Sequence, residues 1–155
     1  MRLELGTNRV RIQKSSVLGT RNRIINNCIV HASQTTITPD FVLLEDVGGG
    51  PRFLVDAKYK TRIDNGRNRI AEPDLYEALA FSTATCCNYV VLAYPAVPRE
   101  SLQLGQVMPF EKIEVGSVKI IGVEIEIKGI SSTNGWTKFS KCAVKEIQNI
   151  VALNK

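Results

Sequence analysis

Apolar runs along the chain predict three strands of a sheet. The near-continuous apolar run from Tyr89 to Tyr94 is typical of a strand that is covered on both faces. Two further runs of strand-forming residues, 39–45 and 52–58, flank the glycine-rich segment 47–51, which is typical of a turn. We therefore expect residues 39–58 to fold as a β-hairpin.

Two segments repeat apolar residues at helical spacing. One helix is predicted to begin near Pro73, which suits the first helical position, with Asp74 and Glu77 in its first turn. Its apolar face would comprise Leu75, Ala78, Leu79 and then Ser82 or Cys86. Because this helix connects the strands 52–58 and 89–94, those two strands are predicted to be parallel.

The second helical pattern covers about residues 137–153. One apolar stripe would dock this helix over the sheet. The stripe consists of Phe139, Ala143, Val144, Ile147, Ile150 and Val151.

Between the helices, residues 99–117 are punctuated by glycine and proline and predict an irregular excursion. Residues 122–128 alternate cleanly, which predicts a half-exposed strand with Glu124 and Glu126 facing water.

The segment before the hairpin has weaker patterns. Residues 9–12 suit a short edge strand, and residues 15–20 resemble a turn. Residues 23–32 fit either a short amphipathic helix or a strand, and their later part favours the strand. Together the patterns predict an α/β fold with a mixed sheet flanked by helices.

Length and composition fit one domain. The 155 residues are 44% apolar and 23% charged, which is ordinary for a folded domain. Within residues 1–155 we distinguish a basic lead segment (1–36), a core with the candidate chemistry (37–98), and a C-terminal strand with a docking helix (99–155). No stretch approaches the ~20 apolar residues of a membrane span, and the first residues lack a signal-peptide run. We expect a cytoplasmic protein with no membrane partner.

The cysteines and the single histidine do not predict a metal cluster. Cys28, Cys86, Cys87 and Cys142 have no Cys-X-X-Cys spacing, and His31 alone cannot complete a usual zinc set. We expect buried or half-buried free thiols and a structural histidine.

The net charge of +5 is concentrated near the start of the chain. Residues 1–39 contain six basic side chains against Glu4 as the single acid: Arg2, Arg9, Arg11, Lys14, Arg21 and Arg23. Such a segment suits a polyanion, because neutralised phosphates release counterions. An ordinary basic surface is the alternative.

The candidate chemistry lies where the second hairpin strand ends in charged residues. Side chains alternate faces along a strand, so Asp56 and Lys58 share one face. A turn near Gly48 or Gly49 would set Asp40 opposite Ala57 or close to it. Two nearby carboxylates tend to share a proton or to bind a divalent cation such as Mg²⁺. With a lysine beside them, they suggest phosphodiester hydrolysis.

These residues resemble a known family. Pro39-Asp40, followed after a turn by Asp56-Ala-Lys58, resembles the signature of the PD-(D/E)XK nuclease superfamily. The segments Asp74-Leu-Tyr-Glu77 and Tyr89 to Pro95 extend the likeness to the McrC-like nuclease subunit of 5-methylcytosine restriction systems. The resemblance covers about residues 37–98. It implies a restriction-endonuclease-like fold and a Mg²⁺-dependent DNA endonuclease in which Mn²⁺ can substitute.

The resemblance also implies roles for individual residues. Asp40 and Asp56 would bind the metal, with the Ala57 carbonyl as a further ligand, and Lys58 would be the catalytic lysine. Glu77, a fourth member of the catalytic set, stands where such families usually carry glutamine. Phe81 stands where RecB-like members usually carry tyrosine, and Glu4 is the only acid before Asp40.

Basic residues near the site would contact DNA phosphates without reading sequence. The candidates are Lys60, Arg62, Arg67 and Arg69 after the hairpin, and Arg9 and Arg11 before it. An ordinary exposed polar loop is the alternative for residues 61–69. Beyond DNA, a homodimer would supply two active sites for the two strands, and a motor subunit driven by nucleoside triphosphate is a further partner of such systems.

Two other functions remain open at this point. One is a nucleic-acid-binding domain of the same fold that has lost catalysis. The other is an assembly module of a restriction complex.

Overall fold

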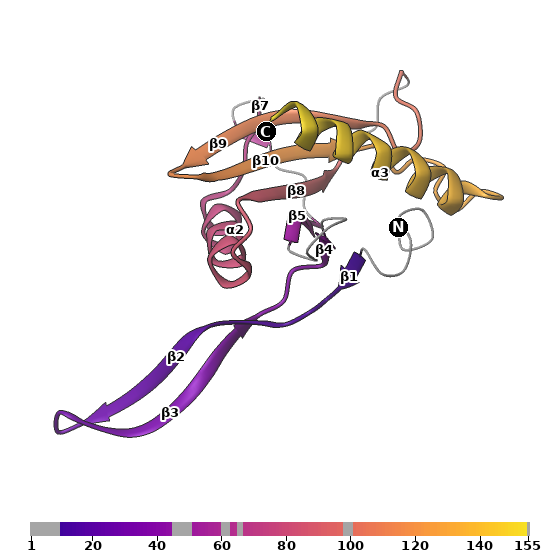
Figure 1. Cartoon of the computed structure of the whole chain (residues 1–155). Helices are drawn as coiled ribbons and strands as arrows, with labels where there is room; N and C mark the ends of the chain where they lie inside the picture. The colour runs from indigo at the N-terminus through magenta and orange to yellow at the C-terminus, as the bar shows by residue number, and fades with distance from the viewer. Residues whose placement is uncertain (1–9, 45–50, 60–62, 65–66, 98–100, 155) are drawn as a thin grey trace.

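A six-stranded mixed sheet forms the centre of the molecule (Figure 1). The computed structural model describes residues 10–44, 51–59, 63–64, 67–97 and 101–154. In spatial order the strands are β1 (Val10–Ile12), β4 (Phe41–Leu44), β5 (Pro51–Ala57), β8 (Tyr89–Pro95), β10 (Val118–Ile125) and β9 (Val107–Val115). Strands β5, β8 and β10 are parallel to one another, and the remaining pairs are antiparallel.

One helix packs on each face of this sheet, so the architecture is mixed α/β. Helix α2 (Glu72–Thr85) covers one face, and helix α3 (Gly135–Leu153) covers the other (Figure 1). Alternation along β5 sends Phe53 and Val55 into the α3 core and Leu54 into the α2 core. Asp56 therefore continues the face that carries α2.

Several predictions from the hydrophobic pattern are confirmed. Strands β4 and β5 form the expected hairpin, β5 and β8 are parallel, and β1 is an edge strand. Pro73 lies at the first positions of α2, and the apolar stripe of α3 is buried except for the half-buried Phe139. In α2 the buried aromatic residue is Phe81, whereas Cys86 ends the helix in a left-handed conformation and is exposed.

Residues 16–37 correct the prediction for the lead segment. They form a long antiparallel hairpin, β2 (Ser16–Ile25) and β3 (Cys28–Ile37), so the turn predicted at 15–20 and the helix option for 23–32 are wrong. The true turn is Asn26-Asn27, where both residues have positive φ. Asparagine tolerates this conformation, and a two-residue turn of this kind matches the twist of a hairpin. We call β2 and β3 the arm.

Two further predictions failed near the C-terminal part of the sheet. Residues 99–117 contain strand β9, which pairs with β10 as the far edge of the sheet. Glu124 and Glu126 were expected in water but are only 5% and 2% exposed. Glu124 is buried because β10 lies between β8 and β9 with both of its faces covered, and Glu126 directly follows that strand. The Glu126 carboxylate accepts a hydrogen bond at Oε1 from the Lys128 N–H at 2.7 Å.

The small elements and the cysteines complete the description. Strands β6 (Ile63–Asp64) and β7 (Arg67–Asn68) pair with each other, while the predicted Asn65-Gly66 turn lies outside the described residues.

The cysteines are free, as expected, but only Cys87 is buried and Cys142 half-buried. Cys28 and Cys86 are exposed, and so is His31.

Candidate functional site

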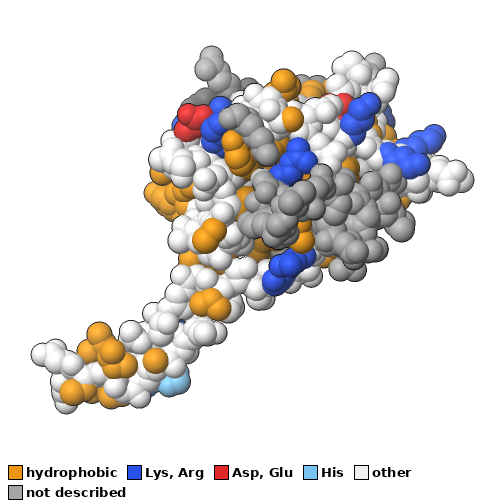
Figure 2. All heavy atoms as spheres, in the orientation of Figure 1, with side chains coloured by type: hydrophobic (Ala, Val, Ile, Leu, Met, Phe, Trp, Pro, Cys, Tyr) orange, Lys and Arg blue, Asp and Glu red, His pale blue; other side chains and the backbone are white. Residues whose placement is uncertain are grey.

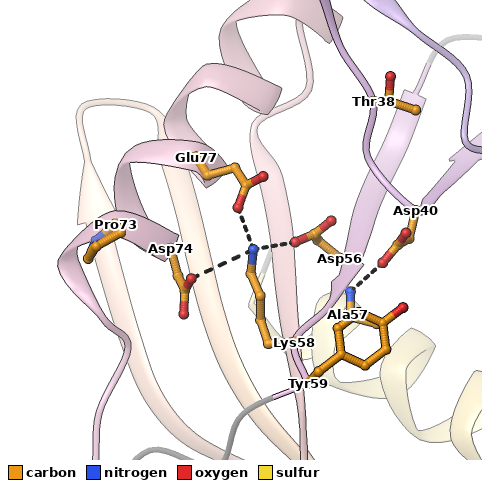
Figure 3. A pocket seen from close by; sticks show the side chains of 9 residues that line it. All are labelled: Thr38, Asp40, Asp56, Ala57, Lys58, Tyr59, Pro73, Asp74 and Glu77. Carbon is orange, nitrogen blue, oxygen red and sulfur yellow. Dashed lines mark hydrogen bonds and ion pairs between the residues drawn. The ribbon is translucent and has the colours of Figure 1, made fainter.

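An open pocket of about 540 Å³ lies where β5 ends and α2 begins (Figure 3). Its lining comes from the segment after the arm, the end of β5 and the first turns of α2: Thr38, Asp40, Asp56, Ala57, Lys58, Tyr59, Pro73, Asp74 and Glu77. All four residues of the predicted catalytic set are among them, together with Ala57. Segments distant in sequence therefore bring these side chains to one place.

Lys58 is the centre of the charged groups in this pocket. Its Nζ lies 2.5 Å from Asp56 Oδ2 and 2.5 Å from Glu77 Oε2 (Figure 3). The side chain is only 13% exposed, and its backbone N–H donates to the Ala93 carbonyl at 2.7 Å. The sheet thus fixes the lysine backbone, and two carboxylates fix its ammonium.

Asp40 closes the hairpin beside this lysine. Its backbone carbonyl accepts from the Gln13 N–H at 2.9 Å, and its Oδ2 accepts from the Ala57 N–H at 2.8 Å. The hairpin register pairs Phe41 with Val55, so the next pair outward is Asp40 and Asp56. The sequence predicted Ala57 or a neighbour opposite Asp40, and the register differs from that centre by one residue.

Asp74 is a charged residue of the pocket that sequence reasoning missed. Its Oδ1 lies 3.8 Å from Lys58 Nζ, and its Oδ2 accepts a hydrogen bond from the Tyr94 hydroxyl at 2.8 Å. The helix dipole already explains an acid in a first helical turn, so the sequence alone does not single out Asp74 as a site residue. A usable signal was its spacing of three residues from Glu77, which places both carboxylates on one helix face.

The surroundings shift the pKa values of the two central groups. Burial, aided by the charges of Asp40 and Glu77, raises the pKa of Asp56 above its ordinary 3.8 although Lys58 opposes this. For Lys58, burial lowers the pKa, but the hydrogen bonds to Asp56 and Glu77 outweigh burial and raise it above 10.5. Lys58 therefore carries its proton at neutral pH.

The raised pKa of Asp56 gives a pH-dependent stability with a definite sign. The folded chain binds this proton more tightly than the unfolded chain, so the stabilisation is present below 3.8 and is lost as pH rises through the folded pKa. Asp56→Asn removes the titration. We compare free energies of unfolding in the presence of a chelator. The value for the variant minus the value for the wild type should increase from about pH 4 to about pH 7.

Urea unfolding at each pH measures this difference, and Glu114→Gln provides a control of opposite sign. The hydrogen bond from Lys112 lowers the pKa of Glu114, so that glutamate contributes stability above its ordinary pKa of 4.5. The relative stability of Glu114→Gln should therefore fall slightly with pH. A flat or falling difference for Asp56→Asn would contradict the assignment.

The donor set of the pocket suits a hard divalent cation. Mg²⁺ prefers oxygen ligands and commonly binds through one or two carboxylates, keeping waters or substrate phosphates as its other ligands. Asp40 and Asp56 are such carboxylates, and Ala57, which directly follows Asp56, also lines the pocket. In the described ranges, no group of three or more His, Cys, Asp or Glu side chains is placed to hold a metal. A divalent cation bound here would therefore need water or substrate for most of its ligands.

The predicted phosphate-binding residues are less fully described. Arg11 lies on β1 and Arg69 immediately precedes the segment that enters α2, and both are exposed. Arg67 belongs to β7. Arg9, Lys60 and Arg62 lie outside the described residues.

The fold and the pocket define a mixed α/β protein with a lysine held among carboxylates at the end of a parallel strand. Comparison with known protein families, curated proteins and solved structures finds no match for this chain. In the described ranges, neither helix combines enough length with enough apolar character to span a bilayer.

Proposed function

We propose that this chain is a metal-dependent nuclease that hydrolyses phosphodiester bonds in DNA, with a restriction-endonuclease-like fold. The observation that carries the proposal is the convergence of Asp40, Asp56, Lys58 and Glu77 in one open pocket. This pocket lies at the end of a parallel strand, where sheets of this type commonly place their sites.

Two aspartates and one backbone carbonyl would hold the cation. Asp40, Asp56 and the Ala57 carbonyl are the ligands that the pocket offers to Mg²⁺, or to Mn²⁺ in its place. When bound, the ion would supply a Lewis acid and lower the pKa of a coordinated water. Lys58 engages Oδ2 of Asp56, which leaves the Oδ1 oxygen of that carboxylate for the cation.

Lys58 would act as a positive charge rather than as a base. Its raised pKa keeps the ammonium protonated, and partial burial strengthens its attraction for the negative charge that develops on the phosphoryl oxygens. Glu77 and Asp56 orient this ammonium within hydrogen-bond distance. Such preorganisation stabilises a charged transition state without further rearrangement.

An assay of supercoiled plasmid and of labelled duplex oligonucleotides tests the proposal. We expect nicked or linear plasmid with Mg²⁺ or Mn²⁺ and none with a chelator, and Asp56→Asn should give no cleavage under either condition. Equal cleavage by the wild type and by Asp56→Asn would indicate a contaminating nuclease and would contradict the assignment. Linear product without a nicked intermediate would favour a homodimer.

A DNA-binding domain without catalysis is the second candidate. The ion pairs of Lys58 favour this candidate. Asp56 and Glu77 each use one carboxylate oxygen to bind Lys58, and those two oxygens are then not free to bind a metal. Calorimetric titration with Mn²⁺ separates the two candidates. The nuclease should bind the ion in the wild type and lose binding in Asp40→Asn, whereas the inactive domain should show no binding that depends on Asp40.

A further inference from the structure

The arm stands clear of the sheet (Figure 1), and apolar side chains lie on its surface (Figure 2). All residues from Thr20 to Gln34 are exposed. At its end lie four large apolar residues, which we call the tip: Ile24, Ile25, Ile29 and Val30, with exposed fractions of 63%, 45%, 62% and 54%. Adjacent apolar side chains at the end of an extended hairpin indicate a surface that is covered by a partner.

The charge of the arm indicates what kind of partner this is. The arm carries Arg21 and Arg23, the segment just before it carries Arg11 and Lys14, and residues 10–37 contain no acidic side chain. All four are exposed. Arg21 and Arg23 share a face of β2, and Arg23 lies opposite His31 on β3. A long surface with cations and no carboxylate is complementary to a polyanion.

A second copy of the chain fits this surface less well. In a two-fold symmetric contact the same patch meets itself, so the arginines of one arm would approach those of the other. The arm has no carboxylate to compensate them. DNA supplies phosphates for the arginines and an apolar base stack for the tip.

We propose that the arm binds the duplex DNA on which the pocket acts, with its basic side chains on the phosphates and its apolar tip wedged into the minor groove. This proposal rests on the proposed function. Proteins that bend DNA insert apolar side chains between base steps of the minor groove, which partly unstacks them. Ten-residue strands of ~3.3 Å per residue reach about 33 Å, close to one turn of the double helix.

The arm is joined directly to the pocket. Strand β3 ends at Ile37, and Thr38 and Asp40 already line the pocket. The Ser15 and Thr38 hydroxyls form a hydrogen bond of 2.8 Å across the base of the arm. A duplex bound along the arm would therefore lie close to the carboxylates and Lys58 of the pocket.

The electrostatic part is tested by DNA binding in a chelator, where cleavage cannot interfere. Fluorescence anisotropy with a labelled duplex should show Arg21→Gln/Arg23→Gln binding at least about ten-fold more weakly than the wild type. The slope of log affinity against log salt should fall by about 2, because two phosphate contacts are lost. Lys141→Gln/Lys145→Gln removes the same charge from exposed positions of α3 and should bind as the wild type does.

The wedge is tested with duplexes that contain 2-aminopurine, whose fluorescence rises when it unstacks. Wild type should raise the signal, and Ile24→Ser/Ile29→Ser should not. Val115→Ser/Leu153→Ser, at exposed apolar positions away from the arm, should behave as wild type. All substituted residues of the arm are exposed, so these variants should fold, which thermal unfolding checks.

The outcomes separate this proposal from the proposed function. Unchanged binding by Arg21→Gln/Arg23→Gln, or no DNA binding by the wild type, overturns the role of the arm. A wild-type dimer in sedimentation that the tip variant dissociates would instead assign the arm to a second copy. If the arm variants cleave DNA and bind it normally, the nuclease proposal holds and the arm proposal fails. If the wild type binds DNA through the arm but does not cleave it, the arm proposal holds and the nuclease proposal fails.

Discussion

Lys58→Met is expected to lower Mg²⁺-dependent DNA cleavage by about a hundred- to a thousand-fold, the effect of removing one preorganised charge donor from an active site. Methionine keeps an unbranched apolar stem of similar length, so the packing around a side chain that is 13% exposed should survive. Only the ammonium between Asp56 and Glu77 is lost. Initial rates on plasmid, measured at saturating Mg²⁺, give the effect.

The same variant should also lose stability as pH rises. Without the ammonium, the neighbouring carboxylates of Asp56 and Glu77 repel each other, which raises the pKa of Asp56 further above its ordinary value. Urea unfolding in a chelator should therefore show a larger deficit near neutral pH than in acid. A deficit that shrinks as pH rises would mean that the lysine does not compensate these carboxylates.

Lys112→Met is the matched control for the loss of a paired lysine. Lys112 Nζ lies 2.7 Å from Glu114 Oε1, but both side chains are well exposed on β9, away from the pocket. Exposed ion pairs contribute little, so this variant should cleave at the wild-type rate. Equal losses in both lysine variants, or full activity in Lys58→Met, would remove Lys58 from the mechanism.

The elements that the sequence predicted well are those whose burial follows a simple period. Strand β8 is apolar throughout because helices cover both of its faces, and α3 has one continuous stripe because only one of its faces is covered. Asp56 could be placed for a related reason. It follows three buried residues of β5, so its face was determined by alternation with Leu54.

Most of the arm and β9 escaped prediction, the arm because it has no buried face and β9 because a proline interrupts its pattern. Every residue of the distal arm faces solvent, so no alternation of burial shaped the sequence around Arg21 and Arg23. In β9, Pro109 looks like a break, but it is tolerated because this strand lies at the edge of the sheet.

Burial of charge is the other property that a linear pattern does not contain. Glu124 alternates with apolar neighbours as a solvated residue would, yet the position of β10 inside the sheet buries it. The same limit hid Asp74, whose place in the site depends on Tyr94, a residue twenty positions further along the chain. Both examples concern partners that only the tertiary structure brings together.

Asp40→Asn and Asp40→Ala separate the two tasks of this aspartate. Asparagine keeps an oxygen that can accept the hydrogen bond from the Ala57 N–H. The free energy of unfolding of Asp40→Asn should therefore stay within about 0.5 kcal/mol of the wild-type value. Alanine leaves that partly buried N–H without this acceptor and should cost about 1–2 kcal/mol. Urea unfolding in a chelator provides both values.

Cleavage should rank these two variants differently from stability. Neither variant retains the charged metal ligand, so part of the transition-state stabilisation that the metal supplies is lost. The cleavage rate of both should therefore fall by at least about a hundred-fold. The stable Asp40→Asn is the decisive variant, because its loss of activity cannot come from a damaged hairpin. If Asp40→Asn cleaves DNA as fast as the wild type, Asp40 serves only to pin Ala57, and a cation in this pocket must be held by Asp56 and its other neighbours.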